Sequence, residues 1–205
     1  SGGIEAIEGI KVAKKMGLRT IVCDGNKNAP GKSYADEFLI GNIYDPAEIK
    51  NVVSKYTKKK SIDGVITIAS DAVRSVSTVA KQLSLPGNSV KTSILSTDKL
   101  KMKELFEKYS LLIPKFVGIN NRNELRKQIE YFGDAVLKPV DNRGARGVIR
   151  INKNSDVDKA FNYSMNFSSS KKLILEKWLS GYQLSTEALV ISGKTYLCGV
   201  ADRNY

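Results

Sequence analysis

Lysine, arginine and glutamate side chains are the groups in this sequence that could bind and polarise phosphate. Lys138 stands in an otherwise apolar run, residues 136–140, where its ammonium group either reaches solvent or meets an anion. The turn that follows has two glycines, which permit close approach of a backbone, and two arginines, which could clamp phosphate oxygens. The turn residues are Arg143, Gly144, Ala145, Arg146 and Gly147. Taken alone, such a turn indicates phosphate binding only weakly.

Residues 175–181 could frame a purine base. Glu176 taken alone is interpreted as a surface acid, but the strand-end backbone around it and the flat indole of Trp178 could hold an adenine ring. A base site here and a phosphate site at the glycine turn would together suit a nucleotide.

The absence of histidine excludes several reaction classes. Ser-His-Asp and Cys-His nucleophiles, the HExxH zinc helix and imidazole ligands are all ruled out within the chain. Cys23 and Cys198 lie far apart in apolar runs, so each is interpreted as a small buried hydrophobe and not as a metal ligand. Acid, base and phosphate chemistry therefore falls to lysine, arginine, aspartate, glutamate and backbone amides.

The net charge of this 205-residue chain is +12, from 33 Lys+Arg against 21 Asp+Glu. Positive charge attracts nucleic acids and nucleotides alike. The basic residues are scattered, however, and the one dense run, Lys58 to Lys60, ends a helical pattern, where cations are favourable. No apolar stretch approaches the roughly 18 residues that span a bilayer. Glu5 and Glu8 lie where a signal peptide needs apolar residues. We expect a cytoplasmic protein without a membrane partner and with nucleic-acid binding unlikely.

The first ninety residues predict alternating helices and strands. Helices are predicted from Ile4 up to Gly17 and at residues 47–56 and 71–83, and strands at 20–23, 37–40 and 64–69. This alternation favours an α/β fold with a Rossmann-like parallel sheet. Because Gly2 and Gly3 resemble the turn after a first strand, we expect that strand upstream of the given sequence. With Asp24 they are reminiscent of a dinucleotide fingerprint, but the GxGxxG spacing is absent, which favours a sheet without a dinucleotide.

The second half predicts two α+β lobes after residues 86–88. One helix is predicted with Ser96, Thr97 and Asp98 as cap candidates, ending near Tyr109. Further helices are predicted at residues 123–132 and 157–167, and strands at 115–118, 135–140, 148–151 and 173–178. A hairpin of residues 184–191 and 194–200 completes the pattern.

The order of three motifs resembles the ATP-grasp superfamily, which includes D-alanine ligases, biotin carboxylases and carbamoyl-phosphate synthase large chains. The motifs are Thr97-Asp98-Lys99 with Lys103, then Leu137-Lys138-Pro139 with the glycine turn, then Glu176-Lys177-Trp178-Leu179 with Glu187. The resemblance covers nearly the whole chain. It implies a Rossmann-like pre-ATP-grasp domain at residues 1–88, a linker helix at 89–113, the small lid subdomain at 114–178 and the start of the C-terminal subdomain at 179–205.

The resemblance also assigns roles toward ATP. Lys99 and Lys138 would contact the α- and β-phosphates, and the turn Arg143 to Gly147 would be a mobile flap over them. Glu176 would accept a hydrogen bond from the adenine amino group. Lys177 and Leu179 would line the base through their backbone amides, with Trp178 packed nearby.

The resemblance implies three further positions, one of which departs from the family pattern. Gln183 stands where the family often has a glutamate for the ribose hydroxyls, and it keeps an acceptor without the charge. Glu187 matches a recurrent acid on the next strand. Arg203 stands where some members place a cation near the transferred phosphate.

The implied activity is that of an ATP-dependent, ADP-forming ligase. A carboxylate substrate would be activated as an acyl phosphate and then attacked by an amine or another nucleophile. The family holds Mg²⁺ through acidic residues on later strands, so we expect the metal ligands and the catalytic residues beyond Tyr205 and little activity from residues 1–205 alone. A non-catalytic nucleotide-binding module is the alternative, and a nucleic-acid-binding protein a remote one. The substrates and a homo-oligomeric state stay open.

Overall fold

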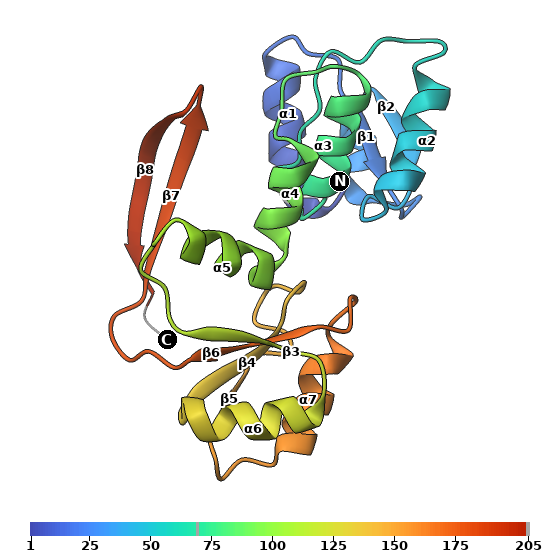
Figure 1. Ribbon diagram of the computed structural model, residues 1–205. Coiled ribbons are helices and arrows are strands. Elements are labelled where there is room, and N and C mark those ends of the chain that lie inside the picture. The colour runs from blue at the N-terminus through green and yellow to red at the C-terminus, as the bar shows by residue number, and fades with distance from the viewer. Residues whose placement is uncertain (69, 204–205) are drawn as a thin grey trace. The chain divides into compact units, whose positions relative to one another are not determined.

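The computed structural model describes residues 1–68 and 70–203. The chain divides into two compact units, Ser1–Met102 and Lys103–Tyr205, and each is described here by itself (Figure 1). The division falls inside the segment predicted as a linker, residues 89–113. This segment contains helices α4 (Val90–Thr97) and α5 (Lys99–Lys108).

The first unit is built on a parallel pair of strands. Strands β1 (Ile21–Asp24) and β2 (Glu37–Ile40) pair with Ile21 opposite Glu37. Around them lie the 3₁₀ helices η1 (Ile4–Ala6) and η2 (Pro30–Tyr34) and the helices α1 (Ile7–Lys15), α2 (Pro46–Tyr56) and α3 (Val73–Gln82). Two small apolar cores hold these elements together, one around Ile10 and Val22 and one around Ile49, Val53 and Val79. The predicted parallel α/β pattern is confirmed.

Two sequence predictions in this unit are wrong. Residues 64–68 form no strand, and Ala69, at the end of that prediction, lies outside the described residues. A strand needs a neighbour for its backbone hydrogen bonds. Among the described strands β1 pairs only with β2, so residues 64–68 have no strand partner. Ile66 in this segment is 75% exposed. Ile4, expected on the buried helix face, is 68% exposed because it lies in the short η1 turn. Helix α4 lies within the segment predicted as one linker helix, residues 89–113, in which the structure has two helices, α4 and α5.

The second unit is an antiparallel sheet with helices on one face. Its strand order is β3-β6-β4-β5, with β3 at Phe116–Ile119, β6 at Leu173–Lys177, β4 at Ala135–Pro139 and β5 at Ile149–Ile151. Helices α6 (Arg122–Phe132) and α7 (Val157–Asn166) lie together against this sheet (Figure 1). Leu125, Ile129, Leu137 and Leu175 belong to the core between them. Every strand and helix predicted for this sheet is confirmed to within two residues.

The chain ends in a long hairpin. Strands β7 (Leu184–Ile191) and β8 (Lys194–Asp202) pair antiparallel, with an irregularity between Glu187 and Ala188. The turn uses Ser192 and Gly193, both with positive φ (50° and 79°), which is the geometry that tight hairpins favour. Side chains on both faces of the hairpin are exposed except Ser185, which is half-buried.

Candidate nucleotide-binding site

Glu176 and Lys138 form a buried ion pair in the sheet of the second unit. Glu176 is 6% exposed on β6, and its Oε1 lies 2.8 Å from Lys138 Nζ. Lys103 Nζ lies 3.6 Å from the other oxygen, Oε2. Two cations thus compensate one carboxylate, which makes burial of the charges tolerable. Glu176 is therefore not the surface acid that the residue alone suggested.

Strand periodicity explains why these side chains meet. Along β4, Ala135, Leu137 and Pro139 are buried on the face that packs against α6 and α7. Because successive side chains alternate, Lys138 projects from the opposite face. In the β4–β6 register, Glu176 lies opposite Val136, which is two residues before Lys138 on the same face. Lys138 and Glu176 are therefore diagonal neighbours.

Lys103 is a member of this cluster to which the sequence assigned no role. It lies in the first motif, four residues after Lys99, and no contact with ATP was predicted for it. The two positions share one face of α5, and this spacing is the signal that could have identified it. Lys99 belongs to the first unit.

The glycine turn between β4 and β5 has an open tip and a packed end. Gly144 and Ala145 have positive φ, 62° and 57°, and nothing lies within 4 Å of the place where a Gly144 side chain would begin. Arg146 is exposed at the tip, and its Nε donates to Arg143 O at 3.3 Å. Gly147, by contrast, is buried against Phe167 and Pro139. If the turn moves as a flap, the tip rather than the Gly147 end is free to do so.

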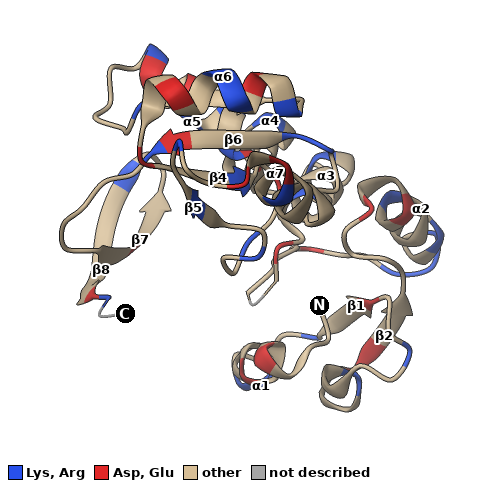
Figure 2. Ribbon diagram, turned by 90° about the horizontal axis from the view of Figure 1, so that it is seen from below, with Lys and Arg blue, Asp and Glu red and all other residues tan. Residues whose placement is uncertain are grey.

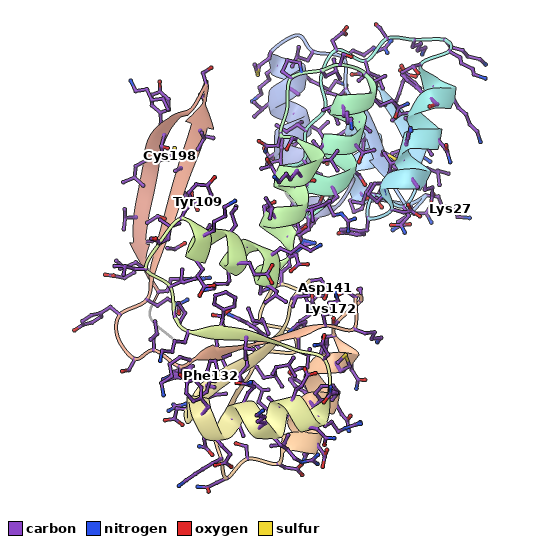
Figure 3. All side chains as sticks on the ribbon, viewed as in Figure 1. Lys27, Tyr109, Phe132, Asp141, Lys172 and Cys198 are labelled. Carbon is purple, nitrogen blue, oxygen red and sulfur yellow. The ribbon has the colours of Figure 1, made fainter. Side chains whose placement is uncertain are left out.

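The root of the turn is fastened to the loop between α7 and β6. Ser168 Oγ and Ser170 N donate to the two carboxylate oxygens of Asp141, at 3.0 and 2.6 Å. Figure 3 shows Asp141 beside Lys172, whose carbonyl accepts from Val140 N at 3.2 Å. These contacts fix the position from which Arg143 and Arg146 extend.

Residues 177–179 contain the backbone amides and the indole that were predicted to line a base. The Lys177 and Trp178 amides are already used, donating to Lys115 O (2.8 Å) and Asp134 O (3.1 Å). The Leu179 amide makes no hydrogen bond within the described residues. The Lys177 side chain turns away to Phe132 O at 2.7 Å, at the end of α6. Of the two amides predicted to line a base, that of Leu179 is the one available.

The indole of Trp178 is half-exposed and covered by a cation. The Arg150 guanidinium lies 4.5 Å from its ring centroid, and Arg150 is held by Asp134 at 3.2 Å. Such stacking is favourable because the ring face is electron-rich. Trp178 is the single tryptophan of the sequence, so its fluorescence reports on this segment.

The remaining predicted residues lie on the hairpin. Gln183 O accepts from Arg203 N at 2.9 Å, which brings these two positions together at the open end of the hairpin. Glu187 is exposed on β7, opposite Gly199. Cys198, expected to be buried, is exposed on β8 (Figure 3), because neither face of the described hairpin is covered. Cys23, also expected to be a small buried residue, is partly buried, and this burial raises the pKa of its thiol to about 11.

The first unit contains a shallow pocket at the carboxyl ends of β1 and β2. It has a volume of ≈ 260 Å³, and Asp24, Gly25, Asn42 and Tyr44 are among its lining residues. Asp24 accepts hydrogen bonds from Gly2 N at 2.7 Å and from Asn26 N at 2.9 Å. Its carboxylate thus fixes the local turns.

Basic residues and potential metal-ligating residues are scattered over the part of the chain that the structure describes. Figure 2 shows lysine and arginine on many elements and no single basic stripe. Within residues 1–68 and 70–203, no three acidic, histidine or cysteine residues gather as a metal site. No helix in that same part of the chain has the length and apolarity needed to cross a bilayer.

Comparisons with known proteins agree with this geometry. Residues 10–87 match the ATP-grasp N-terminal domain family. The formate-dependent phosphoribosylglycinamide formyltransferase of Prochlorococcus marinus (strain NATL2A) is 28% identical over 193 residues, 91% of this chain and 49% of that protein. The crystal structure of phosphoribosylglycinamide synthetase from Anaerococcus prevotii has a TM-score of 0.67 at 26% identity, covering 98% of this chain and 49% of that one.

A more distant structure shares the fold. An ADP complex of N5-carboxyaminoimidazole ribonucleotide synthetase gives a TM-score of 0.78 at 21% identity, covering 100% of this chain and 52% of that one. The chain therefore has the architecture of an ATP-grasp enzyme. Residues 10–87 match the N-terminal domain of that family and the rest resembles part of the grasp fold, so the resemblance predicted from the motifs is confirmed. It spans about half the length of the curated relatives it matches.

Proposed function

We propose that this chain is the ATP-binding part of an ATP-grasp ligase, one that activates a carboxylate as an acyl phosphate for attack by an amine or another nucleophile. The observation that carries the proposal is the cluster in which Glu176, buried on β6, lies between Lys103 of α5 and Lys138 of β4, the strand that leads into the glycine turn. A buried acid between two lysines, beside a turn with two arginines, suits a ligand with an amino-bearing base and an anionic tail.

Each group has a role toward the nucleotide. Lys138 is freed from Glu176 when phosphate oxygens compete for its ammonium group, and it then stabilises their charge. Glu176 accepts from the amino group of the base, and the Leu179 amide donates to the ring. Arg143 and Arg146 approach the phosphates from the glycine turn, while the contacts of Asp141 hold its root. Lys99 is proposed as a second phosphate cation, and Gln183, Glu187 and Arg203 as residues of the ribose and phosphate end.

The proposal also includes a place for the acceptor substrate and for the metal ion. The pocket beside Asp24 and Asn42 is a candidate for the acceptor substrate, since ligands of such sheets bind at the carboxyl ends of strands. Bound Mg²⁺ would neutralise phosphate charge. The described residues do not gather the carboxylates that would hold it. We therefore propose its ligands elsewhere in the protein and derive no step through it.

Binding measured through Trp178 tests the proposal. ATP should change the fluorescence of Trp178, and tripolyphosphate, which has no base, should not. The variant Lys138→Ala removes a charged hydrogen-bond donor, a loss of about 1.5–3 kcal/mol, so ATP affinity should fall roughly 10- to 150-fold. Lys59→Ala, in the exposed run after α2, is the matched control and should leave the affinity unchanged. Equal losses in both variants would mean that only general electrostatics attracts ATP.

The alternative of a non-catalytic nucleotide-binding module makes a different prediction for the whole protein. It would bind ATP as above without forming an acyl phosphate from any carboxylate. The cytoplasmic location stays a prediction from the sequence.

A further inference from the structure

The surroundings of Glu176 leave its charge dependent on the two lysines. In register with it lie Phe116 on β3 and Val136 on β4, and neither side chain can donate a hydrogen bond. Although Lys138 Nζ is 2.8 Å from Oε1, the contact is not aligned as a hydrogen bond, and Oε1 has no hydrogen-bond donor within the described residues. Lys138 is therefore the one group among the described residues that compensates the charge on this buried oxygen.

The two lysines differ in what they can do next. Lys138 leads into the glycine turn, and under the proposed function its ammonium group turns to the phosphates. Lys103 contacts the other oxygen, Oε2, at 3.6 Å, and its side chain is only 13% exposed. When Lys138 leaves, Lys103 is the cation that remains beside the carboxylate. Without it, Glu176 would be a buried carboxylate with no counter-ion, which favours a change of rotamer that turns it away from the base.

We propose that Lys103 is a positioning residue that holds the Glu176 carboxylate with its Oε1 directed at the amino group of the base. The inference rests on the proposed function and adds a determinant of base specificity. Held in this position, the Glu176 carboxylate accepts from the 6-amino group of adenine and repels the 6-oxo group of hypoxanthine; a carboxylate that has turned away does neither. Lys103 therefore controls the preference for ATP over ITP, although it does not itself touch the base.

The experiment measures the affinities for ATP, ITP and tripolyphosphate by calorimetry. For Lys103→Met, we expect the ATP-to-ITP affinity ratio to fall by about tenfold or more, because a charged acceptor is lost, while tripolyphosphate binding stays within about twofold. Lys103→Arg should restore the ratio. Lys101→Met is the control on the same helix, since Lys101 is 52% exposed and pairs with Asp98 at the surface.

The outcomes separate the two proposals. An unchanged ATP-to-ITP ratio in Lys103→Met would overturn the role of Lys103 while leaving the proposed function intact. Equal losses for ATP, ITP and tripolyphosphate would also overturn it, because Lys103 would then be a phosphate ligand. If Lys103→Met does not fold, Lys103→Gln, neutral and similar in length, carries the same expectations. A wild-type protein that binds neither nucleotide would overturn the proposed function itself.

Discussion

Gly147 ends the glycine turn at a place where a side chain has no room. A Cβ built there would lie 2.8 Å from both Phe167 Cβ and Pro139 Cγ, and its φ is +75°. Gly144, at the tip, shares the positive φ of +62° but has open space around it. The two positions therefore separate the cost of the backbone conformation from the cost of packing.

Alanine substitutions at these glycines should differ in stability. Gly144→Ala carries only the left-handed penalty of about 1–2 kcal/mol. Gly147→Ala adds a clash that overpacking data put at about 1–3 kcal/mol, so its free energy of unfolding should be lower again by that amount. Urea unfolding followed through Trp178, which lies in the same unit, measures both. Equal losses would contradict the packed end of the turn.

The sequence predicted which single residues carry the chemistry better than it predicted which residues they contact. Lys138 stood out because a charged residue interrupts an apolar strand, and Glu176 because it precedes the indole. That Lys103 completes the cluster depends on how the segment from residue 103 meets the sheet, and no local pattern encodes that contact. The exposure of Cys198 was missed for a similar reason, because an apolar run predicts burial even where no surface covers the strand.

Helix α6 is an element whose start is fixed by its own side chains. Asn121 Oδ1 accepts from Glu124 N at 2.9 Å, and Glu124 Oε2 accepts from Asn120 N at 2.8 Å. The reciprocal arrangement satisfies amides that the first helical turn leaves without partners. The hydrogen bond from the Asn120 amide also lowers the pKa of Glu124.

Removal of this cap should weaken the second unit. Asn121→Ala is expected to lower the free energy of unfolding by about 1 kcal/mol, because the Glu124 amide loses its acceptor. Asn123→Ala, an exposed position two residues on, makes the same chemical change without touching the cap and should have little effect. Chemical denaturation of the three proteins compares them. The assignment of Asn121 as the cap fails if the two variants unfold alike.

Elements with strong local signals were predictable, and those that depend on neighbours were not. Strands β3 to β6 alternate or run apolar between clear turns, and helices α6 and α7 have polar caps. Residues 64–68 have the same apolar character, yet no described strand pairs with them. Of the three predicted cap candidates, Asp98 caps α5, whereas Ser96 and Thr97 lie in the last turn of α4, which Ser89 caps.

At the scale of the whole molecule, ion pairs make stability depend on pH. In the first unit, Asp36 pairs with Lys14 at 2.7 Å and accepts from Thr20 N at 2.8 Å. Lys14 first, and then Thr20, hold the pKa of Asp36 well below its usual range. A lowered folded pKa means that the stabilisation is present above the unfolded value of about 3.9 and is lost as the pH falls through the folded value.

The variant Asp36→Asn should reveal this dependence. At pH 7 it should unfold at lower urea concentration than the wild type, and the gap should narrow as the pH falls below about 4. Asp63→Asn, an exposed aspartate in the same unit, should shift neither the midpoint nor its pH dependence. Circular dichroism can follow both transitions. A gap that widens toward acid would show that the sign of the linkage is wrong.

The hairpin β7–β8 also matters for the behaviour of the protein in concentrated solution. Leu189, Val190 and Ile191 are 59%, 68% and 58% exposed, and the outer edges of both strands carry no partner strand among the described residues. Unpaired, apolar strand edges are templates on which other chains can add by β-pairing. The net charge of +12 opposes such assembly by mutual repulsion. Added salt screens that repulsion, so ionic strength sets the balance between dispersed protein and strand-mediated aggregation.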